Sequence, residues 1–125
     1  MAEIGMRERM LVKDVMSSPV VTINENEPAQ KAAQLMDKHN VGCIVVVGKQ
    51  GKPLGIITER DLVIRVLARN SQPSKLVAKE VMTSPLITVD PDENLSEAAR
   101  RMSRLNIRRL GVMYKGNLVG LVSSK

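Results

Sequence analysis

The stretch KDVMSSP at residues 13–19 recurs as KEVMTSP at residues 79–85, and this echo decides the fold. Met16 and Met82 lie 66 positions apart. Further matching positions, the last two after one deletion, are Ala32 with Ala98, Asn40 with Asn106, Gly51 with Gly116 and Gly55 with Gly120. Self-similarity at a fixed period indicates a repeated structural unit. The sequence therefore predicts one unit of about sixty residues, present twice.

Composition is typical of a globular protein, with 43% hydrophobic and 26% charged residues among 125. The longest apolar run, Cys43 to Val47, is far shorter than the ~20 residues that span a membrane. Residues 1–10 do not resemble a signal peptide, so we expect a cytoplasmic protein without membrane contact. The single Cys43 cannot form an internal disulfide and is expected to be a small buried hydrophobe.

The net charge of +6 lies in the second copy, because residues 94–125 hold seven basic residues and only one acid, Glu97. The basic residues are Arg100, Arg101, Arg104, Arg108, Arg109, Lys115 and Lys125. Two interpretations stay open: a solvated helix face, or a site for the phosphates of a small ligand or of nucleic acid. The chain has no Phe, no Trp and one Tyr, which disfavours stacking on single-stranded bases.

Each copy predicts the element order β-α-β-β-α. The expected strands are 20–23, 44–47 and 54–57 in the first copy and 86–89, 110–114 and 118–122 in the second. The first helix of each copy is expected to begin at Pro28 or at a capping box of Asn94 with Glu97, and to end at Asn40 or Asn106. Gly-containing turns join the last two strands into hairpins. A second helix is expected over 59–69, with Leu62, Val63, Val66 and Leu67 as its apolar face.

The polar linker 70–74 contains Pro73 and marks the boundary between the copies. We expect an α/β (α+β) fold with a first domain over 1–72 and a second over 73–125. The two copies are expected to pack about a pseudo-twofold axis, with a cleft between them. The second copy stops at Lys125, where its final helix would begin.

The ordered set VMSSPVVTI, AAQLMDKHNVGCIVVV and GKPLGIITERDL, followed by VMTSPLITV, EAARRMSRLNIRRLGVM and GNLVGLVSS, resembles a tandem pair of CBS domains, or Bateman module. The resemblance covers about residues 11–125. It implies a regulatory module that binds an adenosine-containing ligand, such as AMP, ADP, ATP or S-adenosylmethionine, in a cleft between the copies. It also implies a homodimer formed through helices, and an effector that is a separate protein.

The resemblance assigns a ligand motif to residues 55–61, in which Thr58 would contact ribose or phosphate and Asp61 would accept the ribose hydroxyls. An ionised carboxylate suits two hydroxyl donors, because charge-assisted hydrogen bonds are strong. A structural alternative stays open, since Thr-x-x-Asp at a helix start is also a capping box. In the second copy Ser123 matches Thr58, but the position that would match Asp61 lies beyond the chain.

Arg108 and Arg109 match the segment that carries phosphate-binding side chains in the family, and the planar guanidinium donates to two phosphate oxygens. The alternative is that both are surface charges beside a strand. The strand openings, 18–22 and 84–88, would supply backbone contacts and apolar walls for adenine. The candidate ligand-binding residues are Ser18, Val20, Thr22, Ile57, Thr58, Asp61, Ser84, Leu86, Thr88, Arg108, Arg109, Val122 and Ser123.

We expect no enzyme, because one His and one Cys provide neither a triad nor metal-ligand spacing. His39 is expected to cap helix carbonyls. The leading hypothesis is an adenine-nucleotide sensor that needs no cofactor, with a ligand that bridges the copies between Asp61 and the two arginines. The alternatives are contact with nucleic acid through residues 94–109 and a purely structural dimerisation module.

Overall fold

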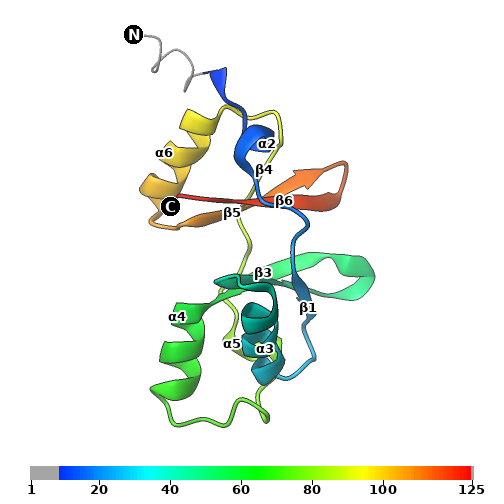
Figure 1. Cartoon of the computed structure of the whole chain (residues 1–125), viewed down its shortest axis with the longest axis vertical. Coiled ribbons are helices and arrows are strands. Elements are labelled where there is room, and N and C mark those ends of the chain that lie inside the picture. The colour runs from blue at the N-terminus through cyan, green and yellow to red at the C-terminus, as the bar shows by residue number, and fades with distance from the viewer. Residues whose placement is uncertain (1–8, 125) are drawn as a thin grey trace. The chain divides into compact units, whose positions relative to one another are not determined.

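The computed structural model describes residues 9–124 and contains two compact units (Figure 1). The central unit consists of residues 21–86. The split unit combines residues 9–20 with residues 87–124. Each unit carries one three-stranded sheet with helices, so the expected mixture of α and β elements is confirmed. No helix among the described residues is both long and apolar enough to cross a bilayer.

The central unit builds its sheet in the order β1-β2-β3. The strands are β1 Thr22–Asn24, β2 Cys43–Val47 and β3 Pro53–Thr58. The helices are α3 Ala29–His39, the 3-10 turn η1 Lys49–Gly51, α4 Glu59–Leu62, the π-helix η2 Val63–Leu67 and α5 Ala78–Val81. Strands β1 and β2 are parallel, with α3 as their crossover, and β2 and β3 form the predicted antiparallel hairpin.

The split unit repeats this plan with the sheet order β4-β5-β6. Its strands are β4 Thr88–Val89, β5 Arg109–Tyr114 and β6 Asn117–Ser123, and its helices are α2 Val12–Val15 and α6 Leu95–Leu105. Strands β4 and β5 are parallel, and β5 and β6 are antiparallel. No helix follows β6 among the described residues, whereas α4 follows the equivalent β3. Lys125 lies outside the described residues.

The two long helices end as the sequence predicts, each at an asparagine. Asn40 and Asn106 adopt left-handed φ angles of 53° and 55°, a conformation that asparagine tolerates better than most residues. At the start of α6, the Asn94 side chain accepts hydrogen bonds from the backbone N–H groups of Ser96 and Glu97. The Glu97 carboxylate pairs with Arg100, so only the asparagine half of the predicted capping box is supported.

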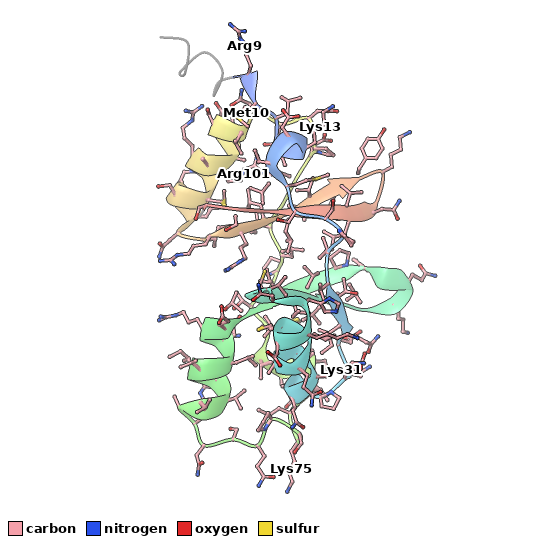
Figure 2. The ribbon with its side chains drawn as sticks, viewed as in Figure 1. Arg9, Met10, Lys13, Lys31, Lys75 and Arg101 are labelled. Atoms are coloured by element: carbon pink, nitrogen blue, oxygen red, sulfur yellow. The ribbon has the colours of Figure 1, made fainter. Side chains whose placement is uncertain are left out.

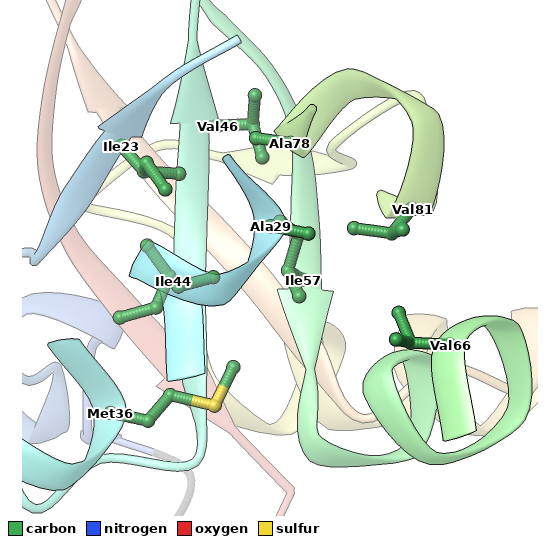
Figure 3. Close-up of a cluster of buried hydrophobic side chains, with 10 residues drawn as sticks. Ile23, Ala29, Met36, Ile44, Val46, Ile57, Val66, Ala78 and Val81 are labelled. Carbon is green, nitrogen blue, oxygen red and sulfur yellow. The ribbon is translucent and has the colours of Figure 1, made fainter. Parts of the chain in front are cut away.

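Each unit has its own hydrophobic core, built from aliphatic side chains. In the central unit, side chains from α3, η2 and α5 cover one face of the sheet (Figure 3). The buried members are Ile23, Ala29, Ala32, Met36, Ile44, Val46, Ile57, Val66, Ala78 and Val81. The core of the split unit consists of Val12, Val89, Ala98, Met102, Leu110, Val112 and Val122. The two cores correspond position by position. Ile44, Val46 and Ile57 of the central unit are matched in the split unit by Leu110, Val112 and Val122.

The short helices α2 and α5, which the sequence did not predict, explain how the units differ from the sequence copies. The first N–H groups of α5 donate to the carbonyls of Glu27 and Glu25, in the acidic turn of the first copy. Those of α2 donate in the same way to Glu93 and Pro91, in the acidic turn of the second copy. Each copy thus contributes its opening helix to the unit that is built mainly from the other copy.

The helix predicted over 59–69 is present as α4 followed by the π-helix η2. Val66 is 5% exposed and packs in the core, but Val63 and Leu67 are 53% and 75% exposed. The chain changes from α4 to a π-helix at Val63, where the N–H of Ala68 donates to the Val63 carbonyl five residues earlier. Two members of the predicted apolar face therefore point away from the core of the central unit.

Candidate functional site

Thr58 and Asp61 form a reciprocal capping box at the junction of β3 and α4. The Thr58 N–H donates to Asp61 Oδ2 at 2.9 Å, and the Asp61 N–H donates to Thr58 Oγ1 at 3.2 Å. The Thr58 hydroxyl also donates to Asp61 Oδ2 at 3.1 Å. The structural role considered from the sequence is therefore confirmed, and it fixes the carboxylate at the end of the sheet.

A second hydroxyl reaches the same carboxylate from a distant part of the chain. Thr83 Oγ1 donates to Asp61 Oδ1 at 2.9 Å. Asp61 is 8% exposed and is the one buried charged residue among those described. Arg65, one turn further along the helix, has its Nη1 atom 3.9 Å from the same Oδ1. The carboxylate thus receives a hydroxyl on each oxygen and lies close to a cation, an arrangement that stabilises buried negative charge.

The backbone places Thr83 beside this carboxylate. Thr83 and Ile56 form an antiparallel bridge, with N–H to carbonyl distances of 2.9 and 2.8 Å. Arg65 holds the preceding residues by donating to the carbonyls of Val81 and Met82. The bridge needs a glycine at position 55, because a Cβ there would lie 2.6 Å from the Thr83 carbonyl oxygen and 2.8 Å from Met82 Sδ.

Sequence reasoning missed both Thr83 and Arg65. Thr83 belongs to the repeated stretch at residues 79–85, directly before the candidate residue Ser84. A usable signal was the difference between Thr83 and its counterpart Ser17, since the copy with the complete Thr-x-x-Asp motif faces the threonine. Arg65 lies four residues after Asp61, a spacing that brings side chains together on a helix.

The split unit contains the same backbone bridge without a carboxylate. Ser17 and Leu121 exchange two hydrogen bonds, of 2.8 and 3.0 Å, and Gly120 accommodates Met16. A Cβ at Gly120 would lie 2.6 Å from Met16 Sδ and 3.1 Å from the Ser17 carbonyl oxygen. Ser123, which matches Thr58, is exposed at the end of β6 and is paired in register with Arg109.

The expected adenine walls differ in their accessibility. Ile57 and Val122 are 0% and 2% exposed, because both side chains pack in the unit cores. Neither residue therefore offers more than a trace of accessible surface in the structure. The other expected residues of the strand openings remain accessible: Ser18, Thr22, Ser84 and Thr88 are exposed, and Val20 and Leu86 are half-buried.

Several arginines of the split unit have structural partners. Arg101 donates to Glu93 Oε1 at 2.9 Å and to the Thr88 carbonyl at 3.2 Å, which fastens α6 to β4 (Figure 2). Arg100 pairs with Glu97 on the exposed face of α6. Within residues 9–124, Arg104, Arg108 and Arg109 have no acidic partner. Arg108 is exposed and Arg109 is half-buried at the start of β5.

The remaining chemically reactive residues show no catalytic arrangement in the part of the chain that the structure describes. His39 is exposed in the last turn of α3. Cys43 begins β2 and is half-buried, more accessible than its apolar surroundings predict. Residues 9–124 hold no group of three or more His, Cys, Asp or Glu side chains that could bind a metal ion.

Comparison with known proteins supports the resemblance seen in the sequence. The model of the family described as CBS domain matches residues 12–68 and 78–125. The protein MK0525 of Methanopyrus kandleri is 38% identical over 113 residues, which cover 90% of this chain and 58% of that protein. An L-aspartate semialdehyde sulfurtransferase of Methanocaldococcus jannaschii is 37% identical over 117 residues, but these cover only 22% of its length. The matched part of the chain thus spans little more than half of the first relative and less than a quarter of the second.

Two solved structures are similar over nearly their whole length. One is the CBS domain pair of protein MJ0100 in complex with 5′-methylthioadenosine and S-adenosyl-L-methionine, with a TM-score of 0.81 and 36% identity over 92% of this chain and 90% of that one. The other is the CBS domain protein PAE2072 from Pyrobaculum aerophilum complexed with AMP, with a TM-score of 0.82 and 30% identity over 91% and 87%. This chain belongs to the CBS domain family and carries the domain twice.

Proposed function

We propose that this chain is a regulatory module that binds an adenosine-containing ligand, and that Asp61 accepts the hydroxyls of its ribose. The observation that carries the proposal is the Asp61 carboxylate, which already receives one protein hydroxyl on each oxygen. A vicinal diol offers the same pair of donors. The complexes of MJ0100 and PAE2072 with adenosine-containing molecules support this ligand class.

In the proposal, Thr58 also contacts the ligand, and Arg108 and Arg109 bind its phosphate groups. The absence of an acidic partner for either arginine within residues 9–124 supports this role, because an unpaired guanidinium is available to an anion. The exposed strand openings, with Ser18, Thr22, Ser84 and Thr88, contribute backbone contacts to the adenine. Val20 and Leu86 supply apolar side chains, and Ile57, Val122 and Ser123 complete the proposed set.

The proposed module acts on a separate cytoplasmic protein and performs no catalysis itself. It forms a homodimer through its helices, which the exposed Val63, Ile64 and Leu67 of η2 support. Ligand binding regulates the partner only if the ligand has different affinities for two conformations. No metal or other cofactor is required in this proposal.

Isothermal titration of the purified chain with AMP, ATP and S-adenosylmethionine tests the ligand proposal. We expect saturable heat with at least one of them, and a loss of affinity of about tenfold or more in Asp61→Ala, since a charge-assisted hydrogen bond contributes roughly 1.5–3 kcal/mol. Asp61→Asn is the control for a change in packing, because an asparagine side chain has the same size as an aspartate side chain. The absence of heat for all three compounds at near-millimolar concentration would contradict the proposal.

A second candidate function is contact with nucleic acid through α6 and the start of β5. Arg104, Arg108 and Arg109 favour it, because they are basic and lack acidic partners within residues 9–124. Binding of a duplex or single strand should then weaken steeply with added salt. Failure to bind either at low salt would eliminate this candidate. If adenosine compounds also fail to raise the thermal midpoint, a purely structural dimerisation role remains.

A further inference from the structure

Arg65 uses a single nitrogen, Nη1, for three contacts around the Asp61 carboxylate. It donates to the carbonyl oxygen of Val81, at 3.1 Å, and to that of Met82. The same nitrogen lies 3.9 Å from Asp61 Oδ1, which is too far for a hydrogen bond. The hydrogen bonds of this nitrogen are therefore made to the backbone, while its positive charge stays close to the carboxylate.

The two carbonyls belong to the end of α5, which has only four residues. A helix leaves its last carbonyl groups without partners inside the helix, and a basic side chain near that end supplies donors for them. So short a helix has little stability of its own. Arg65 thus fixes the residues that lead directly into Thr83, whose hydroxyl donates to Asp61 Oδ1 at 2.9 Å.

The split unit forms the equivalent bridge without an arginine. Ser17 and Leu121 exchange two backbone hydrogen bonds, and no arginine among the described residues donates to the carbonyls of Val15 and Met16. Val15 is 43% exposed, whereas its counterpart Val81 is 1% exposed. The backbone bridge therefore forms without this contact, and the arginine occurs in the unit whose bridge lies beside a carboxylate.

We propose that Arg65 is a positioning residue of the ligand site around Asp61, an inference that rests on the proposed function. It holds the end of α5 so that Thr83 keeps its place beside Asp61 and the chain enters Ser84 from a fixed point. Because Nη1 forms no hydrogen bond to the carboxylate, it accompanies the negative charge without occupying an acceptor position. Loss of Arg65 releases this segment and removes the one cation within 4.0 Å of the carboxylate among the described residues, and both changes weaken ligand binding.

The test measures the affinity of AMP and of S-adenosylmethionine for the full chain and three variants by calorimetry. Arg65→Met removes the charge and the donors, and we expect it to weaken binding of any compound that the wild type binds about five- to tenfold. Arg65→Lys should bind within about twofold of the wild type, since one ammonium nitrogen can replace the single nitrogen that makes the contacts. Arg69→Met controls for the loss of a charge and should bind as the wild type, because Arg69 is exposed and has no ion pair within residues 9–124.

Amide hydrogen exchange separates positioning from a general structural role, because it reports the opening of each bridge by itself. In Arg65→Met, the amides of Thr83 and Ile56 should exchange faster than in the wild type. The amides of Ser17 and Leu121, which form the bridge of the split unit, should exchange at an unchanged rate. Equal acceleration in both bridges would show a general loss of stability and would overturn the positioning role.

The calorimetric outcomes separate this inference from the proposed function. Unchanged affinity of Arg65→Met for a compound that the wild type binds overturns the role of Arg65 and leaves the proposed function intact. A loss in Arg65→Lys as large as that in Arg65→Met overturns it as well, because a charged donor nitrogen would then not suffice. If the wild type binds neither compound, the proposed function fails and this inference fails with it. Arg65→Gln, which is also uncharged, replaces Arg65→Met if the latter does not fold.

Discussion

The segment that ends in Thr83 lies beside β3 in the central unit, and the segment that ends in Ser17 lies beside β6 in the split unit. Both use the same pair of backbone hydrogen bonds and the same glycine contact with a methionine. Among residues 9–124, only the central unit adds side-chain contacts to this bridge, from Thr83 and Arg65 to Asp61, which together we call the lock. The bridge is thus a property of the repeated backbone, whereas the lock is present in the central unit and combines side chains from both copies.

The largest expected difference between the units concerns their bridge glycines. A Cβ at Gly55 would clash with the Thr83 carbonyl oxygen, which cannot shift without breaking the bridge. A Cβ at Gly120 would clash mainly with the flexible Met16 side chain. We expect Gly55→Ala to lower the free energy of unfolding by about 3 kcal/mol and Gly120→Ala by about 1 kcal/mol. Chemical denaturation measures both, and equal losses would contradict the distinction.

Removal of the carboxylate should break the lock of the central unit. Asp61→Ala leaves the Thr58 N–H and the Thr83 hydroxyl without their acceptor. We expect a loss of about 2 kcal/mol in the free energy of unfolding, as is typical when buried polar groups lose their partners. Asp61→Asn should lose less, because the amide oxygen still accepts one donor. A stability equal to that of the wild type would show that the lock does not stabilise the fold.

The two bridge hydroxyls provide a smaller and matched comparison. Thr83→Val should lower the free energy of unfolding by about 1 kcal/mol, because one hydrogen bond to Asp61 is lost. Ser17→Ala in the split unit should change it by less than about 0.5 kcal/mol, since the hydrogen bonds of Ser17 to Leu121 use only backbone atoms. Thermal and chemical denaturation of both variants check this. An equal effect would mean that the split unit also relies on its hydroxyl.

The smallest expected effects come from one exposed ion pair in each unit, Lys31 with Glu27 and Lys13 with Asp92 (Figure 2). The hydrogen bond from Lys31 lowers the pKa of Glu27, so the contribution of this pair is present above the ordinary glutamate pKa and is lost as the pH falls through the lowered value. Lys31→Gln should lower the free energy of unfolding by at most about 0.5 kcal/mol near neutral pH, and should not change it in acid.

The hydrogen bond to Asp92 raises the pKa of Lys13, which gives the opposite pH dependence at the alkaline end. The contribution of this pair is complete below the ordinary lysine pKa and is lost as the pH rises through the raised value. The free energy of unfolding of Lys13→Gln should therefore differ least from that of the wild type at high pH. An unfolding curve for Lys13→Gln that departs from the wild type most strongly at high pH would contradict this assignment.

Much of the fold could be predicted because the repeat carries local signals. Asn40 and Asn106 end the long helices, and Gly51 and Gly116, with positive φ angles, lie in the hairpin turns. The strand alternation of Ile44 and Val46 corresponds to the observed core. The short helices α2 and α5 were missed because each has only four residues and is held by carbonyls from the other copy, which no local pattern reveals.

The candidate site was only partly predictable for the same reason. Thr58 and Asp61 are three residues apart, so their contact could be read from the sequence. Thr83 is 22 residues from Asp61, and its position depends on a backbone bridge that the sequence does not show. The π-helix Val63–Leu67 was missed because the sequence pattern of residues 59–69 predicts a single regular helix.

The preference for adenosine over 2′,3′-dideoxyadenosine, measured by calorimetry in the wild type and in Asp61→Ala, tests the central claim most directly. The claim is that the Asp61 carboxylate accepts a ribose diol. We expect the wild type to prefer adenosine by about tenfold or more, and the variant to bind both nucleosides with equal affinity, because the diol has lost its acceptor. An undiminished preference in Asp61→Ala would contradict the claim.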